Sequence, residues 1–436
     1  MNLITYVQEK MVEILPEILS TYAGEIGDVD LSAMEQQVKQ MSHEVGNEVL
    51  KSWLEMQDGK YPAAAQPCPH CTAQADYVRR RSGLAITLLG RVYYRRSYYC
   101  CAVCGHGHYP LDHRLKIKSG EMSDEVVKCA ALVGIETGFE TSRDRLARLS
   151  LLELSPNSIR KASQLMGATV MRQEAALLAH SQSDEAQHAH RREPEKPQRL
   201  YGSMDGFMVL VEDGWHEMKA GAWWTTRTTR QGELKADNIH YYVDYLPAAE
   251  FANLVWATGF EQSADQALEL VFVADGAAWI WRIVEQHYPQ AIQIVDWYHA
   301  SAYLAPIAAA AFNDELAARR WLDQQTDALW EGRLSQVFHA CRLLVECAPD
   351  AVHTALTYFA RNRHRMRYDK FRQMGLQIGS GTMESGCKQL GLGRLKIAGA
   401  QWSADGARLV AKARAAYLSG QWDEINPSTQ PLPHIA

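Results

Sequence analysis

The stretch from residue 270 to residue 301, LVFVADGAAWIWRIVEQHYPQAIQIVDWYHAS, constrains the fold more than any other part of the chain. Its first segment is a short apolar, β-branched run that closes at Asp275 and Gly276, which predicts a strand followed by a turn. The next segment, AWIWRIVEQHY, has helical spacing and stops at Pro289, and AIQIVD then predicts a second strand ending at Asp296. The pattern therefore predicts one βαβ unit.

Acidic residues close both predicted strands of this unit. In open α/β sheets, ligands and catalytic groups collect beyond the carboxyl ends of the strands, where a carboxylate reaches solvent and a metal. Asp275 and Asp296 are therefore candidate site residues. Because Asp before Gly is also a common turn residue, a purely structural role for both stays open at this point.

Two further segments carry isolated acids. Residues 199–212, RLYGSMDGFMVLVE, predict a strand with Asp205 inside an apolar run, where an acid without a function is disfavoured. The runs EMKAGAWWTTR and IHYYVDYL predict two more strands of an antiparallel meander. Near the other end, GSGTMESGCKQLGLGRLK places Glu384 on a glycine-punctuated helical segment. Three carboxylates from separate elements suit Mg²⁺ or Mn²⁺, which prefer hard oxygen ligands.

The order and surroundings of these acids resemble the DDE transposases of bacterial insertion sequences, whose catalytic core is ribonuclease-H-like. More narrowly, the chain resembles the ISKra family, which is related in layout to Mutator-type transposases. The resemblance rests on YGSMDG at Asp205, VADGAAWIW at Asp275, DWYHA at residues 296–300 and GSGTMESGCKQLGLGRLKIAGAQWS around Glu384. It extends over about residues 68–422, which is most of the chain.

The resemblance implies that Asp205, Asp275 and Glu384 bind two catalytic Mg²⁺ or Mn²⁺ ions. It also makes Asp296 and His299 of the DWYH element accessory residues, with Asp296 competing with Asp275 for the role of second metal ligand. The implied activity is metal-dependent cleavage at the ends of the element, after which the freed 3′-hydroxyl attacks target DNA.

Basic and aromatic residues follow the glutamate. Lys388 and Arg394 are predicted to lie beside the scissile phosphate, where they would stabilise developing negative charge. Lys388 is also four residues after Glu384, which equally suits a helical salt pair. Lys396 and Trp402 are predicted to contact DNA, Trp402 by stacking on a base, although a core position for this tryptophan stays open.

Two Cys-x-x-Cys motifs, CPHC and CAVC, flank a segment that is typical of a β-hairpin turning near Gly90. Each motif offers two thiolates from one tight turn, which is what tetrahedral structural Zn²⁺ requires. The doublet of Cys100 and Cys101 leaves the register open, and His106 and His108 stay open as substitute ligands. The predicted zinc ligands are Cys68, Cys71, Cys101 and Cys104.

The predicted zinc ribbon is rich in Lys, Arg and Tyr, a mixture that can neutralise and stack on DNA. Arg95 and Arg96 are its candidate DNA contacts, although a basic surface that only offsets the acidic N-terminal helices stays open. Residues 119–178 then predict two helices that break at Ser155 and Pro156, the outline of a helix-turn-helix. Its second helix would present Arg160 and Lys161 to DNA.

The remaining segments complete a multidomain α+β fold class, in which the ribonuclease-H-like α/β core carries an all-helical insertion. The exit of this insertion is strongly basic, and Arg363 and Arg367 are predicted to face DNA. The predicted regions are acidic helices 1–60, zinc ribbon 61–118, helix-turn-helix 119–178, linker 179–199, first part of the core 200–304, helical insertion 305–376, return helix with the catalytic glutamate 377–420 and disordered tail 421–436.

Composition limits the function classes. The net charge of −6 excludes a polycation, so any DNA-binding surface must be local. No apolar stretch approaches the roughly 20 residues needed to span a bilayer, and the N-terminal segment lacks the layout of a signal peptide, so we expect a cytoplasmic protein. The expected partners are the terminal inverted repeats of the element, target DNA and further copies of the chain, in a homodimer or higher synaptic oligomer.

Two alternatives to a transposase remain. One is a ribonuclease-H-like DNA nuclease or resolvase that cleaves without strand transfer. The other is a non-catalytic zinc-ribbon DNA-binding protein.

Overall fold

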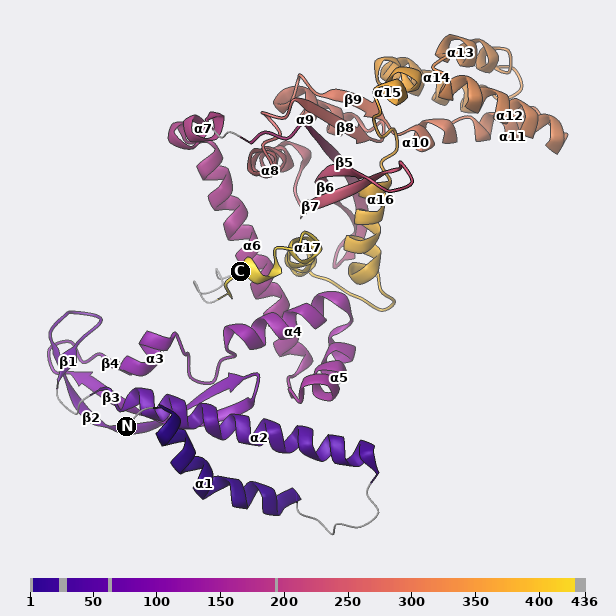
Figure 1. Cartoon of the computed structure of the whole chain (residues 1–436). Coiled ribbons are helices and arrows are strands. Elements are labelled where there is room, and N and C mark those ends of the chain that lie inside the picture. The colour runs from indigo at the N-terminus through magenta and orange to yellow at the C-terminus, as the bar shows by residue number, and fades with distance from the viewer. Residues whose placement is uncertain (1–2, 23–29, 62–64, 193–194, 428–436) are drawn as a thin grey trace. The chain divides into compact units, whose positions relative to one another are not determined.

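The computed structural model describes residues 3–22, 30–61, 65–192 and 195–427. It divides into two compact units, Met1–Met166 with Asn426–Ala436, and Gly167–Ile425 (Figure 1). The fold is α+β, with many helices, an antiparallel sheet in the first unit and a mixed sheet in the second. This confirms the coarse fold class predicted from the sequence.

Two helices and a β-hairpin form the N-terminal part of the first unit. The helices are α1 (Leu3–Tyr22) and α2 (Leu31–Asp58), as predicted for this region. The hairpin strands β2 (Gln74–Thr87) and β3 (Gly90–Cys101) are flanked by the short strands β1 (Gln66–Pro67) and β4 (Gly107–His108) in an antiparallel sheet. Thr87 pairs with Gly90, so the hairpin turns where the sequence predicted.

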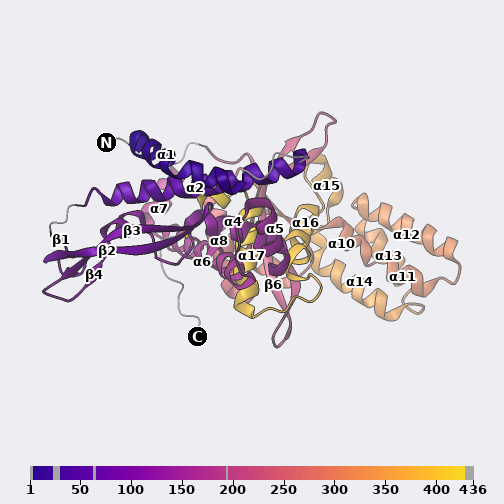
Figure 2. The ribbon, with the colours of Figure 1, turned by 90° about the horizontal axis from the view of Figure 1, so that it is seen from below.

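Helix α2 runs along the hairpin, as Figure 2 shows. Their shared core contains Leu54 of α2, Val92 and Tyr94 of β3, and Leu111 of the short helix α3 (Pro110–Leu115). Helix α2 therefore stabilises the ribbon directly, because its apolar face covers one face of the hairpin.

Three helices follow the ribbon: α4 (Asp124–Glu136), α5 (Phe139–Ser150) and α6 (Pro156–Ser181). Helix α5 ends earlier than predicted because Leu151 adopts a left-handed conformation with φ of 55°. Pro156 occupies the first position of α6, where its missing N–H costs nothing. Helix α6 then continues across the boundary between the two units.

The predicted linker is partly helical. Within it, α7 (Asp184–Arg191) begins with Ser183 as its N-cap. The ring of His190 packs 4.1 Å from that of Phe260, and its Nε2 lies 3.0 Å from Asp265. The polar composition predicted a linker that cannot bury enough surface to fold by itself, and packing against the core supplies that burial. The remainder of this linker includes residues 193–194, which lie outside the described residues.

A five-stranded sheet forms the centre of the second unit, in the order β7-β6-β5-β8-β9. Strands β5 (Arg199–Val211), β6 (Gly214–Thr228) and β7 (Leu234–Asp244) form the predicted antiparallel meander. Strands β8 (Glu269–Ala274) and β9 (Ile292–Val295) extend it in parallel with β5, and α9 (Ala278–His287) connects them. The predicted βαβ unit is therefore confirmed.

Helices cover both faces of this sheet. On one face, Tyr242 packs against Phe251 of α8 (Ala248–Glu261). On the other face, its neighbour Tyr241 lies against Gly386 of α16 (Gly381–Cys387), since successive residues of a strand point to opposite faces. Helix α17 (Ala404–Leu418) also packs along β7.

The segment between β9 and α16 is helical, as predicted for the insertion. It contains α10 (Trp297–Ala302), α11 (Ala305–Ala311), α12 (Glu315–Trp330), α13 (Leu334–Arg342), α14 (Pro349–Asn362), the 3₁₀ helix η1 (Arg363–Arg365) and α15 (Tyr368–Gln373).

The C-terminal segment departs from the predicted disorder at its start. The 3₁₀ helix η3 (Trp422–Glu424) follows α17, and the side chains of Trp422 and Ile425 are buried. Residues 428–436 of the predicted tail lie outside the described residues. None of the helices in the described ranges combines the length and the apolar character that crossing a membrane requires.

Candidate functional sites

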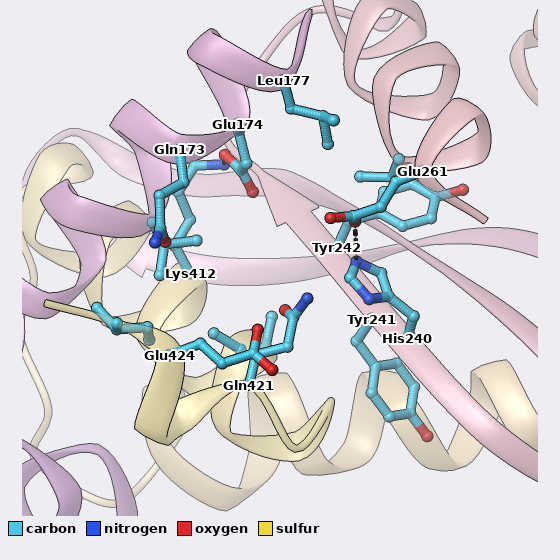
Figure 3. Close-up of a pocket in the computed structure, with 15 residues that line it drawn as sticks. Gln173, Glu174, Leu177, His240, Tyr241, Tyr242, Glu261, Lys412, Gln421 and Glu424 are labelled. Carbon is cyan, nitrogen blue, oxygen red and sulfur yellow. Dashed lines mark hydrogen bonds and ion pairs between the residues drawn. The ribbon is translucent and has the colours of Figure 1, made fainter. Parts of the chain in front are cut away.

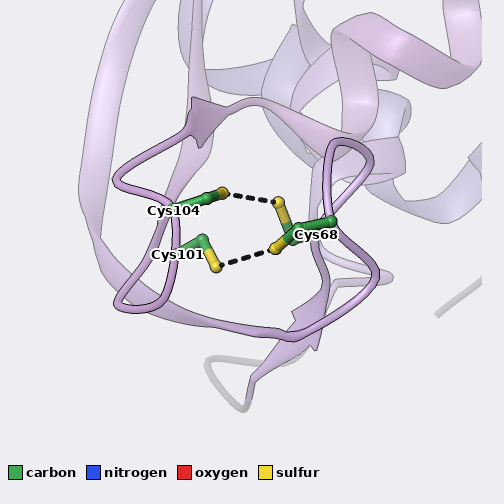
Figure 4. Close-up of side chains that lie close together, drawn as sticks. Cys68, Cys101 and Cys104 are labelled. Carbon is green, nitrogen blue, oxygen red and sulfur yellow. Dashed lines mark hydrogen bonds between the residues drawn. The ribbon is translucent and has the colours of Figure 1, made fainter.

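Four cysteines from the two ends of the ribbon converge on one point (Figure 4). The sulfur of Cys68 lies 3.7 Å from that of Cys104, and the sulfur of Cys71 lies 3.6 Å from that of Cys101. These separations exclude disulfides and match a tetrahedral zinc site, in which sulfurs about 2.3 Å from the metal lie about 3.8 Å apart. The four residues can therefore hold a structural metal such as zinc.

Local backbone geometry builds this cluster. Each motif closes a turn in which the first Cys carbonyl accepts an N–H, from Thr72 in one case and from Gly105 in the other. Both of these residues have positive φ, 63° and 70°. The N–H of Cys104 is the main cause that lowers the pKa of the Cys101 thiol to about 7, whereas burial and the neighbouring thiols raise the pKa of Cys104 and of Cys71.

The cluster resolves the alternatives that the sequence left open. Cys100 is outside it, and its sulfur lies 3.9 Å from the Gly105 carbonyl oxygen. Within the part of the chain that the structure describes, the only set of three or more His, Cys, Asp or Glu close enough to share a metal is these four cysteines, so His106 and His108 are not members.

The register of the parallel strands places three acids at neighbouring positions: Asp205 lies within β5, and Asp275 and Asp296 directly follow β8 and β9. Gly202 of β5 pairs with Phe272 of β8, and continuing this register by three residues brings Asp205 opposite Asp275. Ala274 of β8 pairs with Val295 of β9, so one further residue brings Asp275 opposite Asp296. The sheet thus brings together acids that are far apart in the sequence.

Asp205 and Asp275 influence each other electrostatically. Burial raises the pKa of Asp205, and the negative charge of Asp275 raises it further. The thiol of Cys387 and the nearby His299 act in the opposite direction on the same pKa. Asp275 is half-buried, and its Oδ1 accepts the N–H of Ala277 at 2.8 Å. These four site residues therefore share one environment.

Asp296 differs from the other two acids because both of its carboxylate oxygens are occupied. Its Oδ1 accepts the N–H of His299 at 2.6 Å, which caps α10. Its Oδ2 accepts both the N–H and the hydroxyl of Ser380, the latter at 2.8 Å. The side chain is only 5% exposed. This position suits a structural acid better than a metal ligand.

Glu384 lies on α16, which packs on the sheet, but its side chain is exposed and paired elsewhere. It is 65% exposed and pairs with Lys388 Nζ at 2.6 Å, the helical salt pair that the sequence left open. Among the described residues, no group that includes Glu384 is close enough to share a metal. Cys387, one turn later on the same helix, reaches the carboxylate of Asp205.

A π-helix, η2 (Lys388–Leu395), continues directly from α16. Helices of this type are rare and occur frequently at functional sites. It packs closely on β5, since a Cβ on Gly391 would lie 2.8 Å from the ring of Phe207. The sequence predicted only a helical segment here, because the backbone spacing of a π-helix has no residue signature beyond its glycines.

Arg394 and Trp402 do not occupy the predicted DNA-facing positions. Arg394 is 1% exposed, its guanidinium lies 4.7 Å from the centre of the Trp402 ring, and burial lowers its pKa to about 10. Trp402 is itself buried and donates its indole N–H to the carbonyl of Leu395 at 3.0 Å. Both side chains stabilise the turn after the π-helix, because a buried cation is best tolerated against an aromatic face.

Arg96 is also structural rather than exposed. It is buried, pairs with Asp112 and lies 3.9 Å from the centre of the Tyr109 ring. Arg160 is half-buried and donates to Asn157 and Gln164. Lys396 is half-buried, close enough to Cys387 to act on its pKa. The predicted DNA contacts that are exposed are Arg95, Lys161, Arg363 and Arg367.

A buried ionic cluster in the second unit has no counterpart in the sequence analysis. Lys412 is fully buried and pairs with Glu174 and with Asp244, the latter at 2.8 Å, while Arg408 also pairs with Asp244 at 2.6 Å. A cavity of about 170 Å³ adjoins it, and Figure 3 shows Glu174 above Lys412 in its lining. No sequence signal could reveal this cluster, because its members come from α6, β7 and α17.

Comparison with known protein families gives one match. The family model described as Uncharacterised protein family (UPF0236) matches residues 27–426. The chain belongs to this family. The matched residues include both the cysteine cluster and the acidic strand edge. Comparison with curated proteins gives no match.

Proposed function

We propose that this member of the family is the DDE transposase of a bacterial insertion sequence, with a ribonuclease-H-like core. The observation that carries the proposal is the proximity of Asp205, within β5, to Asp275, directly after the adjacent parallel strand β8, with the helix of Glu384 packed against β5. An antiparallel meander extended by two parallel strands, with acids at their carboxyl ends, supports this assignment.

The chemistry of the acids supports a divalent cation. Asp205 and Asp275 offer hard oxygen ligands, and their mutual repulsion is what a bound Mg²⁺ or Mn²⁺ would relieve. Glu384 would supply the third ligand if its side chain rotated away from Lys388 and toward the ion. Because both side chains are exposed, this salt pair is worth only a few tenths of a kcal/mol and opposes the rotation weakly.

When bound, the ion would lower the pKa of an attacking water or 3′-hydroxyl and stabilise the leaving oxygen. The chain's own residues would orient the DNA. His299 acts on Asp205 from the adjacent α10 and is exposed, so it is available to a DNA strand at this edge. Lys396 adds positive charge near Cys387 on the same side.

Exposed cations at the exit of the helical insertion supply a DNA-binding surface in the same unit. Arg363 and Arg367 flank the buried Arg365, whose guanidinium is held by Glu285 and Gln293. Anchoring of this residue holds its exposed neighbours in place for phosphate contacts. In the first unit, the metal-bound ribbon with Arg95 and the helix with Lys161 would bind the element ends, and we expect a homodimer or higher oligomer.

The test uses the full chain, Mn²⁺ or Mg²⁺, and duplex DNA that ends in the terminal inverted repeats of the element. We expect cleavage at the repeat and a joined product with target DNA, both reduced to background in Asp205→Asn, Asp275→Asn and Glu384→Gln. Asp314→Asn, which alters an exposed cap of α12, is the matched control and should keep full activity.

Other outcomes identify the alternatives. Cleavage without a joined product would indicate a nuclease or resolvase. Binding to the repeats without any product, in both metals, would contradict the catalytic proposal and favour a zinc-ribbon DNA-binding protein.

A further inference from the structure

The segment between α15 and α16 is attached to several strands of the sheet by hydrogen bonds. From the meander, the Tyr201 hydroxyl accepts the N–H of Gln377 at 3.2 Å, and the Trp224 indole N–H donates to the Gln377 side chain at 3.1 Å. The Arg199 guanidinium also donates to two carbonyls that follow α15, and the Gln377 side chain donates to the carbonyl of Leu234 at 3.4 Å. Further contacts come from the start of α10, which follows β9 directly. A short stretch of backbone is therefore held by four different strands or their continuations.

The contacts from α10 are the closest to the acids. The N–H of Trp297 donates to the carbonyl of Ile378 at 2.9 Å. Asp296 accepts two hydrogen bonds from Ser380, through its backbone N–H and its hydroxyl. Hydrogen bonds to a buried carboxylate are among the strongest in proteins, because the acceptor carries charge and competes with little water.

Ser380 in turn begins the helix that carries the glutamate. Its carbonyl accepts the N–H of Met383 at 2.8 Å and the N–H of Glu384 at 3.0 Å. Two hydrogen bonds thus separate the carboxylate of Asp296 from the backbone of Glu384. Since Asp296 is also level with Asp275 in the sheet, the same residue relates the glutamate helix to the aspartate strands.

We propose that Asp296 is a positioning residue that fixes the backbone of Glu384 relative to Asp205 and Asp275, and that it does not bind the metal. The catalytic part of this inference rests on the proposed function, whereas the attachment of α16 does not. The two polar residues of the DWYH motif then have different roles. Asp296 faces inward to Ser380, and His299, whose N–H it accepts, faces the acid edge.

Asp296→Asn separates these roles cleanly. The asparagine oxygen can still cap α10, because Asn is as good an N-cap as Asp. Its amide nitrogen would then face the N–H of Ser380. Both groups are hydrogen-bond donors, so the bond that Asp296 Oδ2 accepts from this N–H would be lost. Ser380→Ala removes only the hydroxyl bond, and Ser380→Thr keeps it. Asp314→Asn is the control, since Asp314 caps α12 without contacting α16.

The first readout is hydrogen exchange of the full chain, which requires no activity. We expect the amides of residues 381–387 to exchange about tenfold faster in Asp296→Asn, as loss of a charge-assisted hydrogen bond predicts. The same amides should exchange slightly faster in Ser380→Ala and as in wild type in Ser380→Thr and Asp314→Asn. Unchanged exchange of these amides in Asp296→Asn would overturn the proposal.

The second readout is the affinity of the full chain for Mn²⁺ alone. If Asp296 acts through Glu384, Asp296→Asn causes no further loss of affinity in a Glu384→Gln background. A further loss there would show that Asp296 is a ligand, and the proposal would fall. If the wild type makes no DNA product but the exchange results hold, the proposed function fails while the attachment of α16 by Asp296 stands.

Discussion

The cysteine cluster and the acidic strand edge are two candidate metal sites that the chain builds in opposite ways. The cysteines come in two Cys-x-x-Cys pairs, each on one turn, and one hairpin joins the two turns. Their sulfurs already lie within 4.8 Å of one another. The acids come from β5, from the residue that follows β8, and from α16, and Glu384 is paired with Lys388. In the first site, local backbone geometry already brings all four ligand atoms together. In the second site, the backbone elements are packed together, but the side chain of Glu384 does not lie with the aspartates.

The difference follows from what each ion does. A structural zinc ion contributes folding energy, so its ligands belong to the elements that it stabilises. A catalytic ion needs open positions for substrate, and its ligands must be held by a scaffold that is stable without it. The buried sheet of the second unit is such a scaffold.

The largest expected effect comes from opening the cysteine cluster. Cys68→Ser should abolish stoichiometric zinc binding and loosen the ribbon, because zinc sites of this type contribute about 10–16 kcal/mol of binding free energy. Metal analysis of the purified protein measures the zinc content. Cys100→Ser is the matched control, since Cys100 adjoins Cys101 but lies outside the cluster, and it should retain zinc. Zinc retained in Cys68→Ser would contradict the four-cysteine assignment.

The scaffold of the second site should depend on its buried charges instead of on a metal. Lys412→Met would leave Glu174 and Asp244 without their shared cation, and we expect a loss of about 3–5 kcal/mol in the free energy of unfolding. Denaturant unfolding measures this, with zinc content unchanged. The exposed pair of Lys118 and Glu121 supplies the control: Lys118→Met should cost less than about 1 kcal/mol. If Lys412→Met and the control variant lowered the free energy of unfolding equally, the buried cluster would not have the expected stabilising role.

The same scaffold should also respond to acid. Burial lowers the pKa of His240 from 6.5 to about 4, so between these values the unfolded chain binds a proton that the folded chain does not. The free energy of unfolding therefore falls as pH falls through this window, by up to about 3 kcal/mol. His240→Gln should flatten that dependence, whereas the exposed His188→Gln should not. If the free energy of unfolding had the same pH dependence in wild type and in His240→Gln, the lowered pKa of His240 would be refuted.

The acidic edge itself should be a source of instability. Asp205→Asn removes the repulsion with Asp275 and keeps an oxygen that can accept the N–H of Gly206, so we expect a gain of about 1 kcal/mol in stability. Thermal unfolding in metal-free buffer measures it. The exposed Asp213→Asn should change stability by less than about 0.5 kcal/mol. Destabilisation by Asp205→Asn would mean that the carboxylate has a structural role.

The smallest effect compares the DNA surfaces of the two regions. Arg95→Ala in the ribbon and Arg363→Ala in the core should each lower the slope of log affinity against log salt concentration by about 1, since each would remove one phosphate contact. Salt titrations of DNA binding measure the slope. A slope that changes in only one of the two variants would confine DNA binding to that region.

The predictions from sequence succeeded where the signal was periodic or closely spaced. Apolar runs and their breaks predicted the βαβ unit, the meander and the helical insertion, because a buried strand or helix face must repeat its apolar residues. The Cys-x-x-Cys spacing predicted the cysteine cluster, because both ligands of each pair lie in one turn. Local polarity misled for α7 and for the start of the C-terminal segment, where packing on the core outweighs composition.

Burial decided what the sequence left open. Arg96, Arg394 and Trp402 have the residue types of a DNA surface, yet each is enclosed by partners from elsewhere in its own unit. Strand ends alone do not separate Asp275 from Asp296, since each follows a strand of the same unit. Only the position of Ser380, 84 residues after Asp296, shows that one of these acids is already occupied. Contacts between residues so far apart depend on the register of the whole sheet, which no local pattern encodes.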